Sequence, residues 1–236
     1  MKLYFRNNTQ NNWKLLFSNP KNTLNFFLNF FVCLIFYFMA IHWVKNNATA
    51  AGSILFDPIQ KHFHSIDFSI YINLLTYSAS LITVLIIIQN PFHLHYIFQA
   101  FTAVFLVRMI CIFLIPLSPA PDMIKLHDPI ANFIANENNI FNDLFFSGHI
   151  ADLTIFYFAI RHSKWRYYLG SCIVLVASMM ILQKVHYTAD LAMAPFFAYT
   201  MYVLFVEKKM MPFFKLAIDG EHSTEQAKNQ GVEFFF

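Results

Sequence analysis

Long apolar runs separated by short polar segments dominate the chain. Helical runs of about 18–21 apolar residues are long enough to cross a bilayer core of about 30 Å. Six segments fit this description, and each is expected to be a membrane-spanning helix: Leu24–Val44, Tyr71–Ile88, Leu94–Leu117, Phe146–Ile160, Tyr167–Val185 and Tyr187–Val206. The pattern therefore predicts an all-α, polytopic membrane protein built as a six-transmembrane-helix bundle.

The first segment admits a second interpretation, and the fourth is less regular than the others. Residues 48–50, Ala-Thr-Ala, follow the first segment and resemble a signal-peptide cleavage site. The apolar run before them has about 20 residues, whereas signal peptides carry about 7–15, so a retained span is favoured over a cleaved one. The fourth segment has a polar start, Ser147-Gly148-His149, and a short purely apolar part.

Composition excludes a soluble domain. Of the 236 residues, 58% are hydrophobic and 12% are charged, whereas a soluble domain carries roughly 25% charged residues. The net charge is only +3, and the basic residues other than Arg108 lie in loops or at the ends of the chain. They therefore indicate topology and not a nucleic-acid surface. Cys33, Cys111 and Cys172 lie within apolar runs, where we expect buried apolar side chains.

The distribution of Lys and Arg predicts the orientation, because cytoplasmic loops are enriched in them. If all six segments cross, one side carries ten of these residues up to Lys215, and the other carries four: Lys45, Lys61, Lys125 and Lys184. The expected organisation is a cytoplasmic segment 1–23, a membrane domain 24–206 and a cytoplasmic tail 207–236. The loop 118–145 then faces the periplasm or an organelle lumen. The short loops favour a bacterial inner membrane.

Three polar groups lie at that outer face, where polar residues in apolar segments are candidates for function. The first comprises Asp143, Ser147, Gly148, His149 and Asp152. Ser147 is expected to cap a helix whose free N–H groups bind phosphate, and Gly148 permits close approach of a ligand. The alternative is an ordinary helix cap beside an incidental histidine.

The second group is His186 and Asp190, and the third is Arg108. Residues four apart share one helix face, so the Asp190 carboxylate is placed to accept the imidazole N–H and fix its tautomer. An arginine about six residues inside an apolar segment needs an anion or a route to the interface. The alternatives are an interfacial polar turn for the second group, and snorkelling or a structural ion pair for Arg108.

Together these groups suit phosphoryl transfer through a phosphohistidine. Two histidines, a carboxylate and an arginine are expected to converge beside one helix N-terminus. The sequence contains neither a metal-binding H-E-x-x-H spacing nor a nucleotide-binding G-x-x-x-x-G-K loop. No metal and no cofactor is therefore expected.

The order and spacing of these residues resemble the type 2 phosphatidic acid phosphatase superfamily. Its sphingomyelin synthase branch is the closer match, with an Asp four residues before Ser-Gly-His, as Asp143 is here, and a His-Tyr-Thr-x-Asp motif, as residues 186–190 are. That branch also has an arginine in a span ending in Leu-Pro-x-Pro, which Arg108 and residues 117–121 approximate. The similarity covers about residues 105–206. The phosphatase branch has an arginine where Met180 stands and a Lys-x(6)-Arg-Pro motif that is absent here.

The resemblance implies a mechanism. His186 would attack the phosphorus of a phospholipid, with Asp190 orienting it. His149 would protonate the departing lipid alkoxide and then deprotonate the acceptor hydroxyl. The remaining candidates would hold the phosphoryl oxygens or support the site as further acids: Ser147, Gly148, Arg108, Asp143 and Asp152.

The expected function is transfer of a phosphocholine- or phosphoethanolamine-type head group from a phospholipid to a lipid hydroxyl. Hydrolysis of a lipid phosphate is the alternative, since it differs only in using water as the acceptor. A non-catalytic transporter or scaffold is the rival from another class. It is disfavoured because the polar residues gather near one face and no two matching halves occur. The expected partners are membrane lipids and no nucleic acid, and a homo-oligomer is compatible with the sequence.

Overall fold

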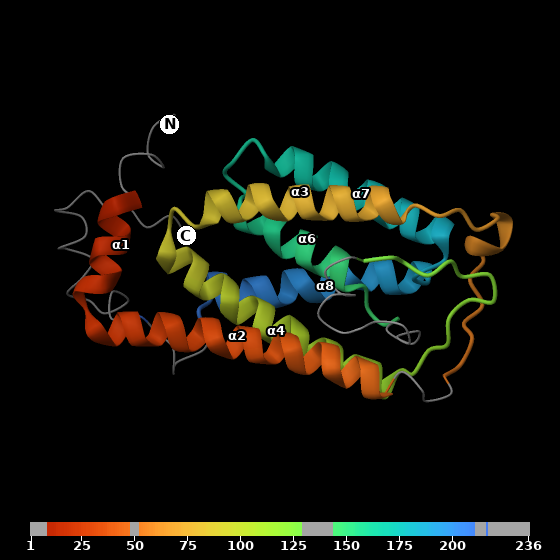
Figure 1. Ribbon diagram of the computed structural model, residues 1–236, viewed down its shortest axis with the longest axis horizontal. Coiled ribbons are helices and arrows are strands. Elements are labelled where there is room, and N and C mark those ends of the chain that lie inside the picture. The colour runs from red at the N-terminus through yellow and green to blue at the C-terminus, as the bar shows by residue number, and fades with distance from the viewer. Residues whose placement is uncertain (1–8, 48–51, 129–143, 211–215, 217–236) are drawn as a thin grey trace.

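The computed structural model describes residues 9–47, 52–128, 144–210 and 216 of the chain. Every regular element in these ranges is helical, and Ser53 and Leu117 form an isolated β-bridge. The helices are α1 (Thr9–Ser18), α2 (Pro20–Asn47), the short 3-10 helix η1 (Gln60–His62), α3 (Ser69–Ile87), α4 (Pro91–Leu114), α6 (Gly148–Ala159), α7 (Arg166–Gln183), α8 (Thr188–Tyr202) and the π-helix η2 (Val203–Glu207). Most of them run along one long axis (Figure 1).

Five helical segments within the described ranges are long and apolar enough to cross a membrane: α2, α3, α4, α7 and the continuous α8–η2. Large apolar side chains cover their outer surface, as on α3, where Ile70 is 79% exposed and Leu74 is 64% exposed. Such a surface is stable against lipid and not against water. The prediction of an all-helical integral membrane protein is confirmed at this level.

The predicted fourth span, Phe146–Ile160, differs from the other five. In its place the structure has α6, with 12 residues, which is about 18 Å long and shorter than a hydrocarbon core of about 30 Å. The helix starts late because Ser147 is still extended, with φ −61° and ψ 119°. The count of six spans is therefore not confirmed.

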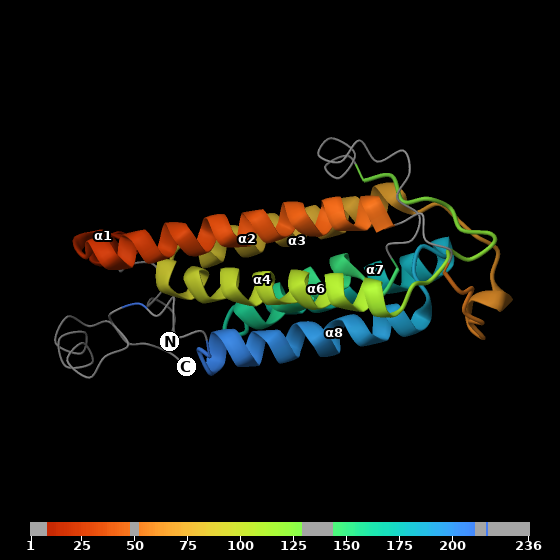
Figure 2. The same cartoon turned by 90° about the horizontal axis from the view of Figure 1, so that it is seen from below.

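The short helix α6 nevertheless runs along most of α4. Before its start, the Phe146 carbonyl accepts a hydrogen bond from Arg108, near the end of α4. At its end, the Ala159 carbonyl lies 3.0 Å from Nε2 of His93, near the start of α4. Figure 2 shows α4 and α6 in the middle layer, with α2 on one side and α8 on the other. Ile150, Leu153 and Ile155 of α6 are at most 1% exposed, so this helix forms the centre of the core.

One end of the bundle, here called the α1 end, is closed by an apolar cluster of Leu16, Phe26, Phe92 and Leu216. The helix α1 lies across this end instead of along the bundle (Figure 1). Its Trp13 donates an indole hydrogen bond to the Ile88 carbonyl, 2.9 Å away, at the end of α3. An interfacial position for residues 13–17 fits this geometry.

Buried polar side chains attach α2 to α4. Asn29 is 1% exposed and donates a hydrogen bond to the His95 carbonyl at 2.6 Å. Gln99 Nε2 lies 3.1 Å from His95 Nε2, one turn further along α4. Such contacts hold two helices in register in an apolar medium. That residues 24–44 are retained and not cleaved stays a prediction.

The opposite end, here called the site end, gathers the α2–α3 connection, the segment after α4 and the start of α8. The bridge between Ser53 and Leu117 brings the first two together, since Ser53 N–H donates to the Pro116 carbonyl at 3.1 Å. Gly52 permits this approach, because a Cβ there would lie 2.5 Å from the Leu117 carbonyl carbon.

A topological prediction follows from the position of α6. If residues 144–160 cross the membrane despite the short helix, the α2–α3 connection and the α6–α7 turn lie on opposite sides. We expect single cysteines introduced by His64→Cys and His162→Cys, in a chain lacking its own three cysteines, to react with a membrane-impermeant thiol reagent from opposite sides of sealed vesicles. Labelling of both from the same side would mean that α6 enters and leaves at one face.

Candidate functional site

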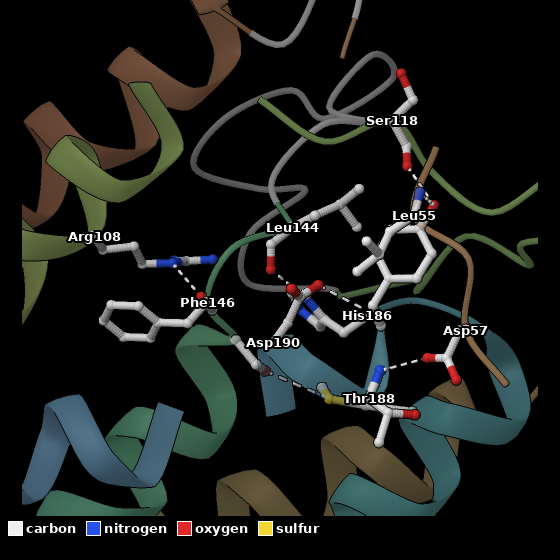
Figure 3. A network of polar contacts seen from close by, with 12 residues as sticks. Leu55, Asp57, Arg108, Ser118, Leu144, Phe146, His186, Thr188 and Asp190 are labelled. Atoms are coloured by element: carbon white, nitrogen blue, oxygen red, sulfur yellow. Dashed lines mark hydrogen bonds and ion pairs between the residues drawn. The ribbon is translucent and has the colours of Figure 1, made fainter. Parts of the chain in front are cut away.

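His186 lies at the site end, immediately before α8, and is 5% exposed. Its Nδ1 lies 2.8 Å from the Leu144 carbonyl oxygen and 3.8 Å from Oδ2 of Asp190 (Figure 3). Both neighbours are hydrogen-bond acceptors, so Nδ1 must carry the proton. In the neutral ring the lone pair then lies on Nε2, as a nucleophilic histidine requires. The closer acceptor is the Leu144 carbonyl, where the sequence analysis expected Asp190.

Asp190 is fully buried, and its carboxylate also binds the backbone at the start of α8. Oδ2 accepts a hydrogen bond from the Tyr187 N–H at 3.1 Å and closes the first turn of α8. Oδ1 is buried and has no hydrogen-bond partner. A negative charge held this close to the ring stabilises a charged imidazole more than it would in water. The spacing of four residues between His186 and Asp190 places them together as predicted.

The segment before α6 connects His186 to Arg108. Its Leu144 carbonyl faces His186, and two residues later the Phe146 carbonyl accepts a 3.0 Å hydrogen bond from Arg108 Nε (Figure 3). Arg108 therefore does not snorkel away from the site. Its guanidinium lies over the N-terminus of α6.

Gly148 allows the guanidinium to lie there. A Cβ at this position would be 2.7 Å from Arg108 Nη1 and 3.0 Å from its Cζ, closer than side-chain carbons approach other atoms. From the sequence, Gly148 was predicted to admit a ligand. In the structure the group admitted is the Arg108 side chain, which itself carries anion-binding N–H groups.

Ser147 stands at the N-cap position of α6, but its side chain does not cap the helix. Its hydroxyl instead lies 3.7 Å from the sulfur of Met180, and Ser147 is fully buried. The expectation that this hydroxyl caps the helix is therefore wrong in this structure, because the side chain turns into the core. The same contact places Met180 beneath the start of α6.

His149 has a carboxylate partner that the sequence analysis did not assign. Its Nε2 lies 3.5 Å from Oδ2 of Asp128, and the hydroxyl of Tyr77 donates to the other oxygen of that carboxylate. The His149 side chain is 25% exposed, so it remains accessible to a ligand.

The segment carrying Asp128 is fixed by one face of α3. Ser69, Asn73 and Tyr77 are spaced four residues apart, and each hydrogen-bonds to residue 127 or 128. This stripe of polar residues on an otherwise apolar helix is the feature of the sequence that could have indicated a contact with a polar segment.

The α2–α3 connection supports the His186 turn from the other side. Asp57 Oδ2 accepts a 2.7 Å hydrogen bond from the Thr188 N–H, which opens α8 (Figure 3), and Gln60 Nε2 donates to the His186 carbonyl at 2.6 Å. Burial alone would raise the pKa of Asp57, but hydrogen bonds from the N–H groups of Thr188, Gln60 and Ile59 lower it below its ordinary value. Neither residue carried a recognisable motif.

The remaining predicted residues are Asp152 and Asp143. Asp152 lies on α6 one turn after His149 and interacts electrostatically with His149 and Arg108. Asp143 lies outside the described residues. Among the residues that the structure describes, no group of three or more His, Cys, Asp and Glu side chains is arranged to hold a metal ion.

Comparison of the chain with protein-family models, curated proteins and solved structures finds no match. The structure therefore defines only the arrangement of the site in a helical membrane protein. It consists of two histidines with carboxylates near their ring nitrogens, and an arginine over a helix N-terminus. The resemblance to the type 2 phosphatidic acid phosphatase superfamily stays a prediction.

Gly148→Ala tests the position of Arg108. The new Cβ would displace the guanidinium, which is the end of a flexible side chain, so the fold should survive. We expect any lipid turnover to fall by about a hundredfold, the effect of a displacement of about 1 Å at a reacting centre, with little change in thermal stability. Gly170→Ala on α7 is the control, because its Cβ meets Tyr157 at 3.4 Å, an ordinary contact. Equal activity in the two variants would contradict the role given to Gly148.

The lowered pKa of Asp57 predicts that the stability of the folded protein depends on pH. Its folded-state pKa lies below the ordinary 3.8, so above that pH the carboxylate is ionised in both states and stabilises the folded one. As the pH falls below 3.8, the unfolded chain is protonated first and the contribution shrinks, until it vanishes below the folded-state pKa. We expect Asp57→Asn to lower stability by about 1 kcal/mol at neutral pH, typical of a helix cap, and by less near pH 3. Thermal unfolding in detergent measures this, and a constant difference across the range would contradict it.

Proposed function

We propose that the protein is a membrane-embedded lipid phosphotransferase, which moves a phospho-head group from a phospholipid to a lipid hydroxyl through a phosphohistidine. The observation that carries the proposal is the state of His186. Its Nδ1 faces two acceptors, the Leu144 carbonyl and Asp190, in a buried setting, and in the neutral ring this arrangement leaves the Nε2 lone pair for attack on phosphorus. The motif resemblance and the neighbouring cationic Arg108 support the same chemistry.

The donor phosphate would bind where positive groups meet. Arg108 and the first N–H groups of α6 lie at one point, because Gly148 lets the guanidinium rest against the helix start. A phosphoryl group gains charge-assisted hydrogen bonds from the arginine and favourable interaction with the helix dipole. These interactions strengthen as negative charge builds on the equatorial oxygens in the transition state.

In the first half-reaction, Nε2 of His186 forms a bond to phosphorus while the bond from phosphorus to the lipid oxygen breaks. His149 gives its proton to that oxygen, and a diacylglycerol leaves. Asp128, 3.5 Å from His149 Nε2, stabilises the protonated ring that this step needs.

In the second half-reaction, the neutral His149 takes the proton of an acceptor hydroxyl as that oxygen attacks phosphorus. The bond between phosphorus and Nε2 breaks, and His186 returns to its starting state. Asp190 supports the positive charge on the phosphorylated imidazole from a fully buried position. Water in place of the lipid hydroxyl would make the same residues a lipid phosphate phosphatase.

Thin-layer chromatography of fluorescent lipids tests the proposal. Purified protein is incubated with unlabelled phospholipids and with fluorescent ceramide or diacylglycerol, and in parallel with fluorescent phosphatidic acid. We expect a new phospho-head-group product on an acceptor lipid, and its loss by a factor of about a thousand or more in His186→Ala. His162→Ala, an exposed histidine near the other end of the bundle, should keep full activity.

Two outcomes would contradict parts of the proposal. Diacylglycerol released from phosphatidic acid, without a new phospholipid, would make the protein a phosphatase. Lipid turnover that persists in a correctly inserted His186→Ala variant would exclude the phosphohistidine.

A further inference from the structure

Gln183 is the last residue of α7 and a fully buried amide that the proposed mechanism does not use. The helix ends there because Lys184 adopts the left-handed conformation, with φ 57°, and His186 follows two residues later. A buried amide is costly unless its hydrogen bonds are satisfied. The partners of Gln183 therefore indicate which parts of the chain it holds in place.

The side chain of Gln183 binds two different segments. Its Oε1 accepts a hydrogen bond from the Phe68 N–H at 3.0 Å, directly before α3. Its Nε2 donates to the Ser69 hydroxyl at 2.9 Å and to the carbonyls of Ile124 and Lys125 at 3.3 and 3.4 Å. The amide thus joins the end of α7, the start of α3 and the segment after α4. The helices α3 and α7 pack side by side (Figure 1).

The backbone of the segment after α4 is held by the same two helices. The Gln183 carbonyl accepts a hydrogen bond from the Ile124 N–H at 3.1 Å, and the Ser69 hydroxyl accepts one from the His127 N–H at 3.2 Å. That hydroxyl donates its own proton to Asp67 at 2.7 Å. The donor and both lone pairs of the Ser69 hydroxyl are therefore occupied, and Ser69 holds His127 in one position.

The segment ends beside the general acid–base histidine. Asp128 follows His127 directly, and its Oδ2 lies 3.5 Å from Nε2 of His149. The strength of this contact depends on its distance, which in turn depends on where the segment is held. Because the end of α7 leads on to His186, the amide of Gln183 also sets this pair relative to the nucleophile.

We propose that Gln183 is a positioning residue of the site, which keeps the Asp128 carboxylate against His149 by anchoring the segment after α4. The inference rests on the proposed phosphotransferase function and adds a residue to it. Gln183 acts through Asp128, so its effect on turnover is confined to the proton transfers of His149. Phosphate binding by Arg108 and the start of α6 does not depend on it.

The test is a double-mutant cycle between Gln183→Met and Asp128→Asn, with kcat and KM measured for transfer to a fluorescent lipid. Methionine keeps the length of the side chain and removes its hydrogen bonds. We expect Gln183→Met to lower kcat by about a hundredfold, the effect of a displacement of about 1 Å at a reacting centre. The KM should stay nearly unchanged, because the lost interaction acts in the transition state. In the Asp128→Asn background the same change should cause little further loss, since the two residues act through one contact.

Hydrogen exchange gives a second readout that does not need turnover. The N–H groups of Ile124 and His127 bind the Gln183 carbonyl and the Ser69 hydroxyl. We expect a peptide covering residues 122–128 to exchange faster in Gln183→Met than in the wild type. Ser69→Ala removes the same anchor from α3. It should lower kcat in the same way without adding to the effect of Gln183→Met, and it carries the test if Gln183→Met does not fold.

Asn29→Leu is the matched control. Asn29 is also a buried amide that joins two helices, through a 2.6 Å hydrogen bond to the His95 carbonyl, but it lies on α2. We expect this variant to lose thermal stability, as Gln183→Met does, and to keep the kcat of the wild type. An equal loss of kcat in Asn29→Leu would mean that turnover responds to stability alone, and would overturn the positioning role.

The remaining failures are distinguishable. An unchanged kcat in Gln183→Met, or an equal loss with and without Asp128→Asn, would overturn the role of Gln183 and leave the phosphotransferase intact. Unchanged exchange of residues 122–128 in Gln183→Met would do the same. Absence of any lipid turnover by the wild type would overturn the proposed function and, with it, this inference.

Discussion

Two backbone carbonyls, those of Leu144 and Phe146, hold the site together. One lies 2.8 Å from the ring of His186 and the other accepts a hydrogen bond from Arg108. Both belong to the non-helical segment before α6, where carbonyl groups have no intrahelical partner and are open to side chains. The site therefore depends on the late start of α6. A helix extending back to residue 144 would direct these carbonyls to its own N–H groups and away from His186 and Arg108.

The surrounding connections fix this irregular segment at the site end. Tyr187 donates its hydroxyl to the Ser118 carbonyl at 2.8 Å, and the Leu55 N–H reaches the same hydroxyl at 3.3 Å. Together with Asp57, these contacts join the α2–α3 connection, the segment after α4 and the start of α8 around His186. Backbone outside helices survives at such a position only when protein groups satisfy it. The described parts of these connections thus support the site.

The charges of the site are arranged so that each is balanced from a different element. His186 is backed from α8 by Asp190, and His149 from the segment after α4 by Asp128. Asp152 shares the electrostatic environment of Arg108 and His149 from within α6. In surroundings of low polarity these interactions are stronger than in water.

The sequence by itself determined the membrane class, five of the helices and the pairing of His186 with Asp190. Each of these depends on local periodicity or on the length of an apolar run, which neighbouring residues along the chain decide. Predictions from the sequence failed for features that depend on contacts between segments far apart in the chain. The Ser147 hydroxyl turned toward Met180 and not toward its own helix, and α6 proved shorter than the apolar pattern suggested.

The contacts of Asp128 with His149 and of Asp57 with Thr188 join residues 21 and 131 positions apart. No spacing rule connects residues so far apart in sequence, because loop packing brings them together. Only the tertiary structure decided which carboxylate faces His149 and which one supports the start of α8, since both depend on which buried polar groups can satisfy one another when no water is present.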